Sequence, residues 1–175
     1  MIYLLICVII LLDQLFKYFI SIHIEIGEVV PVIDHFFYLT HQKNAGAAFS
    51  LFSNYSWGIY VLTAFSIIVM IVLLFFLITK RKKTLFLLQL DVAVLVSGSI
   101  GNLIDRIRLK SVTDYLLFKF GEYVFPIFNL ADICIVISSI GLVLLIIFKE
   151  DLFTPDSKSE KIEDESRDQE QEETL

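Results

Sequence analysis

The sequence has 175 residues, of which 57% are hydrophobic, and its mean hydropathy of +0.76 is well above that of soluble domains, in which about half of the residues are apolar. The formal net charge is −6, but residues 149–175 hold eleven acidic and four basic side chains, so residues 1–148 carry a net charge of only +1. The length excludes a multidomain protein, and the absence of a basic stripe with interleaved aromatic residues excludes a typical nucleic-acid partner. We expect one membrane-embedded domain over residues 1–148 and an acidic, disordered tail over residues 149–175.

The first candidate membrane span runs from Met1 to Ile20. A signal peptide is the alternative, but the run has no basic N-terminal region and no small-x-small cleavage pattern. Asp13 and Lys17 lie four residues apart, on one helical face, where they can neutralise each other. We therefore expect a retained transmembrane helix with its polar end at the outer interface.

Residues 21–56 do not form a span. Apolar and polar residues alternate over residues 22–26, and residues 29–33 follow a Gly-containing turn, which predicts a small pair of strands at the membrane surface. The aromatic residues 36–38 suit the interfacial belt of a membrane protein. In the segment Asn44 to Ser50, small residues allow close backbone approach and Asn44 can donate and accept hydrogen bonds, although a plain loop is the default interpretation.

Three further runs, residues 57–79, 84–104 and 128–148, are long enough to cross a hydrocarbon core of ~30 Å at ~1.5 Å per residue. Four helices place both ends of the chain on one side. The basic connector Lys80 to Lys83 assigns that side to the cytoplasm by the positive-inside rule. The opposite side has five bases of its own: Lys43, Arg106, Arg108, Lys110 and Lys119. The stretch 98–132 then faces outward.

This outward stretch concentrates polar residues in an otherwise apolar chain: Asn102, Asp105, Arg106, Asp114, Asn129 and Asp132. Ionisable side chains at membrane depth mark a functional site or are paired internally. Asn129 is placed to cap the last helix, and Asp132 falls in its first turn, where the helix dipole favours a carboxylate by ~0.3–1 kcal/mol. Asp114 lies just beyond the third span. If these elements pack together, Asp114 and Asp132 can share a water, one as base and the other as acid.

Structural roles are the alternative for several of these residues. Helix caps and internal ion pairs use acids at the same positions. We expect Asp105 to pair with a nearby Lys or Arg, whereas Arg106 can bind an anionic or carbonyl group. Asp91, inside the third span, has no functional interpretation, and pairing with the basic connector at residues 80–83 is the simplest account.

Other chemistries find less support in the sequence. There is no Gly-x-Ser-x-Gly elbow and no His-Glu-x-x-His motif. Three histidines, His23, His35 and His41, have no ligand spacing, and Cys7 and Cys134 lie in apolar runs that indicate neither a disulfide framework nor a metal site. A Ser/Lys arrangement stays open. We expect no metal and no cofactor.

Five short motifs in the chain resemble, in order, those of the lipoprotein signal peptidase (signal peptidase II) family. They are Asp13-Gln14-x-x-Lys17, Asn44-x-Gly46-Ala47-Ala48-Phe49-Ser50, Gly101-Asn102-x-x-Asp105-Arg106, Val112-x-Asp114-Tyr115 and Phe128-Asn129-x-Ala131-Asp132. The resemblance implies an all-α membrane protein with four transmembrane helices and a small extracytoplasmic β-cradle between the first and second. It departs from the family's pattern at Ser97-Gly98, where two glycines are usual, at Asp91 and in the acidic tail.

The resemblance also implies an activity. It predicts an aspartyl endopeptidase of the bacterial inner membrane that removes signal peptides from prolipoproteins by cutting before a diacylglyceryl-cysteine. Asp114 and Asp132 match the family's catalytic pair. Four residues match polar positions around substrate and inhibitor, namely Asn44, Asn102, Arg106 and Asn129. Globomycin-type inhibitors and the lipid bilayer are the other expected partners.

Two other classes of function compete with hydrolysis. A small transporter or proton relay could use Asp13, Asp91, Asp105 and Asp132 to pass cations, but the acids gather at one interface instead of forming a chain across the bilayer. A non-catalytic assembly factor would tolerate Asn in place of both Asp114 and Asp132.

Overall fold

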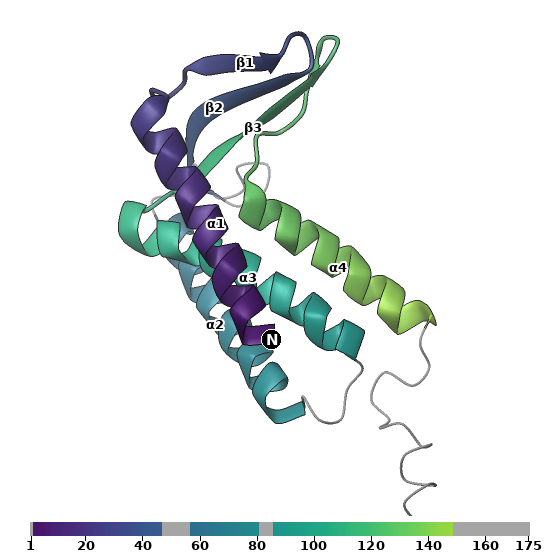
Figure 1. Cartoon of the computed structure of the whole chain (residues 1–175). Coiled ribbons are helices and arrows are strands. Elements are labelled where there is room, and N and C mark those ends of the chain that lie inside the picture. The colour runs from purple at the N-terminus through teal and green to yellow at the C-terminus, as the bar shows by residue number, and fades with distance from the viewer. Residues whose placement is uncertain (1, 47–56, 81–85, 149–175) are drawn as a thin grey trace, which may run out of the picture.

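The computed structural model describes residues 2–46, 57–80 and 86–148 (Figure 1). The end of the Asn44 to Ser50 segment, most of the basic connector and the acidic tail lie outside the described residues, so the expectations for them stay predictions.

Four helices are long and apolar enough to cross a membrane, as the hydropathy predicted. They are α1 (Ile2–His23), α2 (Gly58–Lys80), α3 (Phe86–Leu109) and α4 (Leu130–Phe148). The main difference from the predicted spans is at the end of α3, which continues five residues past Ile104 to Leu109. Asp105, Arg106 and Arg108, which lie beyond the predicted end of the span, are therefore helical residues.

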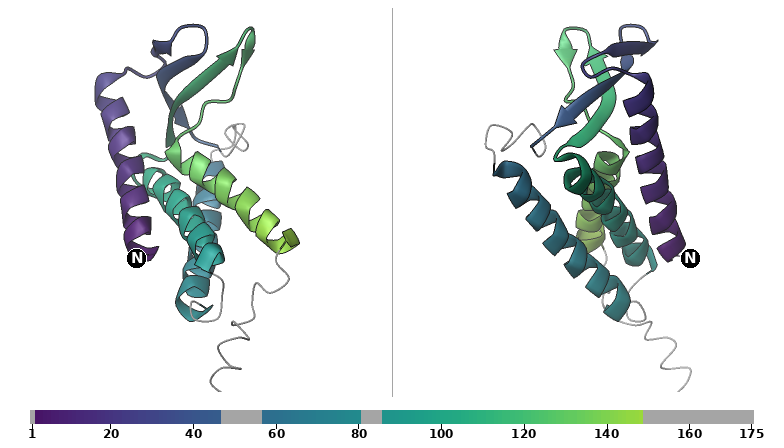
Figure 2. Two further views of the ribbon diagram at one scale, coloured as in Figure 1. Left: turned by 45° about the vertical axis from the view of Figure 1, so that its right-hand side comes forward. Right: turned by 90° about the vertical axis from the view of Figure 1, so that its left-hand side faces the viewer.

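Helix α3 lies between the other three helices in both views of Figure 2. Its small residues permit this packing, because a Cβ atom added to Gly98 would lie 2.5 Å from the carbonyl oxygen of Ala131 in α4. Apolar side chains of α1, α2 and α3 form the largest buried cluster: Ile2, Ile6, Leu77, Leu88, Val92, Ala93 and Val96. The polar residues of the predicted site lie nearer the C-terminal ends of α1 and α3, away from this apolar cluster.

A four-stranded antiparallel sheet in the order β1-β2-β3-β4 covers one end of the helices (Figure 1). Its strands are β1 (Val29–Ile33), β2 (Phe37–Asn44), β3 (Val112–Phe120) and β4 (Tyr123–Val124). The central pair, β2 and β3, joins segments from opposite halves of the chain, with Lys43 opposite Thr113 and Asn44 opposite Val112. The sheet therefore places β3, which follows α3, against β2, which belongs to the connection after α1.

Two sequence predictions about the strands were wrong. The alternating residues 22–26 do not form a strand, because α1 continues through His23, whose Nδ1 contacts the carbonyl oxygen of Phe19 at 2.9 Å. A turn then follows, in which Gly27 adopts a φ of +86°. The cradle was also expected wholly between the first and second helices, but β3 and β4 come from the connection between α3 and α4.

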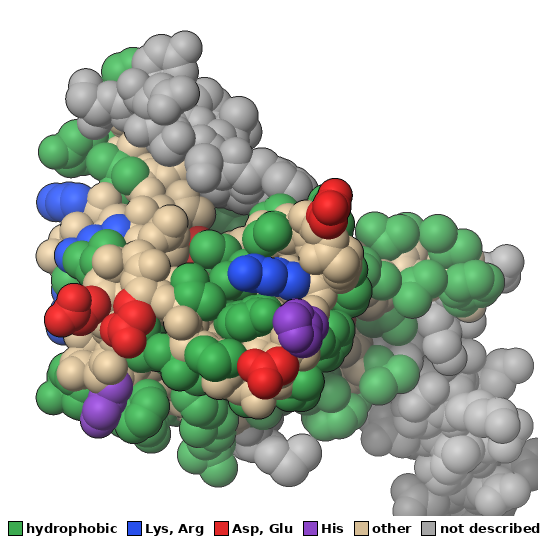
Figure 3. All heavy atoms as spheres, turned by 90° about the horizontal axis from the view of Figure 1, so that it is seen from above, with side chains coloured by type: hydrophobic (Ala, Val, Ile, Leu, Met, Phe, Trp, Pro, Cys, Tyr) green, Lys and Arg blue, Asp and Glu red, His purple; other side chains and the backbone are tan. Residues whose placement is uncertain are grey.

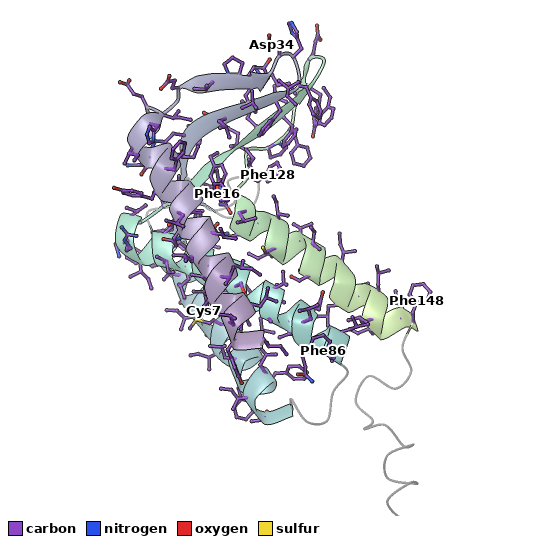
Figure 4. The ribbon with its side chains drawn as sticks, in the orientation of Figure 1. Cys7, Phe16, Asp34, Phe86, Phe128 and Phe148 are labelled. Carbon is purple, nitrogen blue, oxygen red and sulfur yellow. The ribbon has the colours of Figure 1, made fainter. Side chains whose placement is uncertain are left out.

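Aromatic stacking fixes the segment that leads into α4. Phe118 of β3 stacks on Phe37 at 4.8 Å and on Phe128 at 5.8 Å between ring centroids. Phe128 also forms an isolated bridge with Leu116, whose N–H donates to the Phe128 carbonyl at 2.8 Å. Figure 4 shows Phe128 where the sheet meets the first turn of α4. The residues after Phe128 are thereby held beside β3.

Candidate active site

The first turn of α4 is capped from three directions. Asn129 and Asp132 cap reciprocally: the Asp132 N–H donates to Asn129 Oδ1 at 2.9 Å, and the Asn129 N–H donates to Asp132 Oδ2 at 3.2 Å. The N–H of Leu130 donates to the Tyr115 hydroxyl at 3.3 Å, and the N–H of Ala131 donates to Asp13 Oδ1 at 3.0 Å. The predicted cap is confirmed, and these contacts satisfy the N–H groups that a helix start leaves unpaired.

Asp114 lies on β3 and is buried, with 3% of its surface exposed. Its Oδ1 accepts a hydrogen bond of 2.7 Å from Asn129 Nδ2, and its Oδ2 accepts one of 3.0 Å from Asn44 Nδ2. Asn44 reaches this carboxylate because β2 and β3 are paired at that point. Both carboxylate oxygens of Asp114 therefore have an amide donor, each from a different part of the chain.

Asn102 of α3 links this group to Asp132. Its Nδ2 donates to Asp132 Oδ1 at 2.8 Å, and its Oδ1 accepts from Asn129 Nδ2 at 3.2 Å. The two carboxylates predicted to act together are thus the ends of one hydrogen-bonded chain that runs from Asp114 through Asn129 and Asn102 to Asp132.

The orientation of the three amide side chains follows from their neighbours. Nitrogen and oxygen of an amide are assigned from the hydrogen-bond network, and each amide oxygen here faces a group that can only donate. Each amide nitrogen must then face a carboxylate. The donors are the Lys17 ammonium to Asn102, the Asp132 N–H to Asn129 and the Gly46 N–H to Asn44, all at 2.9 Å.

Behind these amides lies a buried ion cluster between α1 and α3. Lys17 Nζ is 2.9 Å from Asp13 Oδ2 and 3.4 Å from Asp105 Oδ2, and at most 4% of any of the three side chains is exposed. The predicted pairings of Asp13 with Lys17 and of Asp105 with a nearby base are confirmed. Asp105 Oδ2 also accepts the Thr113 N–H at 3.0 Å, so the cluster fixes the start of β3 next to Asp114.

The surroundings of Asp114 favour its neutral form. Burial, followed by the negative charge of Asp132, raises the pKa of Asp114 to about 6. The hydrogen bonds from Asn44 and Asn129 oppose this rise by stabilising the charged form. Burial also raises the pKa of Tyr115, which therefore stays a phenol. At neutral pH the carboxyl of Asp114 can both hold and release a proton, as a general acid or base requires.

Arg106 lies apart from the amide chain but close enough for its charge to interact with those of Asp132 and Asp114. Its Nη1 contacts Ser66 Oγ of α2 at 3.5 Å. Its Nε is buried and has no hydrogen-bond partner in the part of the chain that the structure describes. Arg106 therefore carries a buried donor that these residues leave without an acceptor.

Sequence reasoning gave no role to Gln14 or Tyr115, and to Gly101 it gave only close contact between helices. Gln14 Nε2 donates to Asp13 Oδ2 at 3.2 Å and to Asp105 Oδ1 at 3.3 Å. A Cβ atom on Gly101 would lie 2.6 Å from Asp13 Oδ2. The available signal was their position, because each lies directly beside a charged or polar residue of the motifs.

Asp91 is not part of the site. It lines a separate cavity of about 240 Å³ between α3 and α4. Its expected partner, the basic connector, lies mostly outside the described residues. Within residues 2–46, 57–80 and 86–148, no group of three or more His, Cys, Asp or Glu side chains is arranged to hold a metal ion.

Comparison with known proteins points to one family. Residues 5–148 match the family described as "Signal peptidase (SPase) II". A lipoprotein signal peptidase of Listeria welshimeri is 35% identical over 160 residues, which cover 91% of this chain and 97% of the relative, and one of Bartonella bacilliformis is 42% identical over 137 residues, covering 77% and 80%. A bacterial membrane enzyme solved by the in meso method at 2.3 Å resolution superposes with a TM-score of 0.75 at 30% identity, over 83% of this chain and 87% of that one.

Proposed function

The chain belongs to the signal peptidase II family, and we propose that it removes signal peptides from prolipoproteins by an aspartic mechanism that uses Asp114 and Asp132. The cut falls just before the diacylglyceryl-modified cysteine. The observation that carries the proposal is the pair of buried carboxylates joined by the amides of Asn129 and Asn102. Two carboxylates in one site, with a pKa of about 6 for Asp114, share a proton in the way that hydrolysis by an acid–base pair requires.

The chemistry begins with one proton on the pair. Asp114 carries it, because burial and the charge of Asp132 favour its neutral form. Asp132, in the first turn of α4 where the helix dipole favours negative charge, takes a proton from water. The resulting hydroxide attacks the peptide carbonyl carbon while Asp114 protonates the carbonyl oxygen. When the C–N bond breaks, the cysteine amine takes the proton from Asp132, and the carboxyl of the signal peptide forms as its hydroxyl proton returns to Asp114.

Four residues lie around the substrate in this proposal, of which Arg106 binds it and three asparagines position the carboxylates that act on it. Arg106 is suited to a substrate carbonyl, because its buried Nε has no protein partner among the described residues. Asn102 donates a hydrogen bond to the carboxylate of Asp132, and Asn129 donates one to the carboxylate of Asp114. Asn44, at the end of β2, donates a hydrogen bond to Oδ2 of Asp114. A globomycin-type inhibitor would bind at the same residues.

The proposed site faces the outer side of the bacterial inner membrane, with both chain termini in the cytoplasm. The positive-inside rule places the basic connector after α2 in the cytoplasm, and the sheet lies at the opposite end of the helices (Figure 1). Asp132 at the start of α4 is then at the membrane boundary. A cysteine that carries two acyl chains can reach this depth without leaving the lipid.

The test compares three equivalent substitutions. Asp114→Asn and Asp132→Asn should each abolish cleavage of a diacylglyceryl-modified prolipoprotein while the protein still accumulates in membranes. Asp34→Asn is the matched control, because Asp34 lies exposed at the tip of the sheet, far from the helices (Figure 4). Cleavage should also continue in EDTA, since the mechanism uses no metal. Wild-type turnover by either dyad variant would remove that residue from the chemistry.

A further inference from the structure

A second cavity lies on the other side of the strands that carry Asn44 and Asp114. It has a volume of about 650 Å³, within the range of roughly 300–1,000 Å³ typical of small-molecule sites. The ends of α1 and α3 and the strands β2 and β3 form its walls. Its lining residues include Tyr18, Glu25, Lys43, Asp105, Arg108 and Thr113. We call it the rear groove.

The rear groove is separate from the proposed catalytic site. Side chains of successive strand residues point to opposite faces of a sheet. Lys43 and Thr113 are paired across β2 and β3 and line the groove, whereas their neighbours Asn44 and Asp114 contact each other on the opposite face. An occupant of the groove would therefore not touch the dyad.

Two exposed basic side chains line the groove. Lys43 and Arg108 are exposed, and neither forms an ion pair in the part of the chain that the structure describes. Other bases are already engaged: Lys17 with two carboxylates, and Lys110 and Lys119 over the rings of Tyr60 and Tyr38.

The two acidic side chains that line the groove differ in how far their charge is already neutralised. The oxygens of Asp105 already accept hydrogen bonds from Gln14 and the Thr113 N–H, with Lys17 as their counter-charge. Glu25, which is exposed at the rim, is the remaining acid among the lining residues. The unpaired charge at the groove is therefore positive.

The position of the groove favours a ligand that comes from the membrane. It lies where α1 and α3 end, and both helices are candidate membrane spans. Exposed Tyr18, Ile26 and Leu109 line it together with the basic residues. Seen from the sheet end, basic side chains lie at one edge of the molecule beside hydrophobic and acidic ones (Figure 3). A phosphate at the end of two acyl chains meets both the charges and the apolar rim. We propose that the rear groove binds the head group of an anionic membrane phospholipid.

Lipid binding to the full-length chain in detergent micelles tests the proposal. The wild type is titrated with phosphatidylglycerol or with phosphatidylcholine of the same acyl chains, and bound lipid is counted by native mass spectrometry. The wild type should retain one phosphatidylglycerol in preference to phosphatidylcholine. The double variant Lys43→Gln/Arg108→Gln should bind phosphatidylglycerol roughly 30-fold more weakly. This factor is the combined contribution of two bases near a membrane surface to the attraction of an anionic lipid.

The double variant Lys110→Gln/Lys119→Gln is the matched control, since it removes the same charge from bases that stack on tyrosine rings. It should keep the preference for phosphatidylglycerol. Equal loss in both double variants, or no preference in the wild type, would overturn the proposal. Displacement of the lipid by an equal concentration of glycerol phosphate would also overturn it, because the groove would then select a soluble phosphate ester. Cleavage activity does not enter this readout, so the result is independent of the proposed function.

Discussion

Asn129 donates a hydrogen bond of 2.7 Å from Nδ2 to Oδ1 of Asp114, while its own Oδ1 accepts the N–H of Asp132 at 2.9 Å. One side chain therefore caps α4 and holds the carboxylate of a neighbouring strand. The position of Asp114 and the start of α4 cannot vary independently, and this coupling makes Asn129 the first residue to alter.

Two substitutions at Asn129 separate its roles. Asn129→Ala should lower the free energy of unfolding by about 1 kcal/mol through the lost cap and slow cleavage by roughly 10²- to 10³-fold, a typical cost for one preorganised donor. Asn129→Ser keeps a capping oxygen but not the amide donor, so it should retain most of the stability and lose the same activity. Thermal unfolding and initial cleavage rates of the two variants measure this. A fast Asn129→Ser enzyme would show that the amide is dispensable.

The charge of Asp132 should be visible in the titration of Asp114. Because this charge helps to raise the pKa of Asp114 to about 6, Asp132→Asn should lower that pKa. Infrared difference spectra of the protonated carboxyl band across pH 4 to 8 would measure the shift. An unchanged titration would mean that the two carboxylates do not interact.

The same pKa predicts how pH affects activity and stability. For the free enzyme, kcat/KM should fall as pH rises above about 6, because the pair then loses its shared proton. The folded-state pKa of Asp114 is raised above its ordinary value of 3.8, so the stability that this group contributes is full below pH 3.8 and is lost as pH rises through about 6. A pH–rate profile that stays flat through this range would contradict the assignment of the proton.

Lys17 should contribute strongly to the stability of the fold. Lys17→Met leaves the buried carboxylates of Asp13 and Asp105 without their cation, which typically costs about 3–5 kcal/mol. The variant should unfold at a much lower temperature and accumulate poorly in membranes. Lys110→Met, at an exposed position, serves as the control. If both variants melt together with the wild type, the cluster does not stabilise the fold.

Close contact between α3 and α4 should depend on Gly98. Gly98→Ala would place a Cβ atom 2.5 Å from the Ala131 carbonyl oxygen, forcing the helices apart at a cost of about 1–3 kcal/mol. Cleavage should slow as well, because the Asn102–Asp132 hydrogen bond spans the same two helices. Ser99→Ala, one residue along α3, introduces the same side chain and should leave both properties near wild type. The comparison uses thermal unfolding and cleavage rates.

The sequence predicted the helices well and the sheet poorly. Long apolar runs are a strong signal, and all four helices were found. The alternation of residues 22–26 looked like a strand, but those residues continue or follow α1. Strand β3 was missed because most of its nine residues are buried, so it shows no alternation of polar and apolar side chains. Its partner β2 lies about 70 positions earlier, beyond the reach of local patterns.

Local spacing also limited what could be predicted of the site. The pairing of Asp13 with Lys17 follows from helical periodicity, and the cap by Asn129 follows from its place before an apolar run. The contacts that join different helices and strands could not be predicted from the sequence. The hydrogen bond from Lys17 to Asn102 joins residues 85 positions apart, and the one from Asn44 to Asp114 joins residues 70 positions apart. Such contacts depend on how the elements pack, which no local pattern encodes.

The hydrogen bond from the Ala131 N–H to Asp13 Oδ1 crosses 118 positions and joins the first helix to the last. During translation these two residues leave the ribosome far apart in time. Until the fourth helix has entered the bilayer, Asp13 has no such donor and Asp114 lacks the amide of Asn129. A partly synthesised chain therefore lacks the assembled site, and proteolytic activity would arise only when all four helices have been inserted.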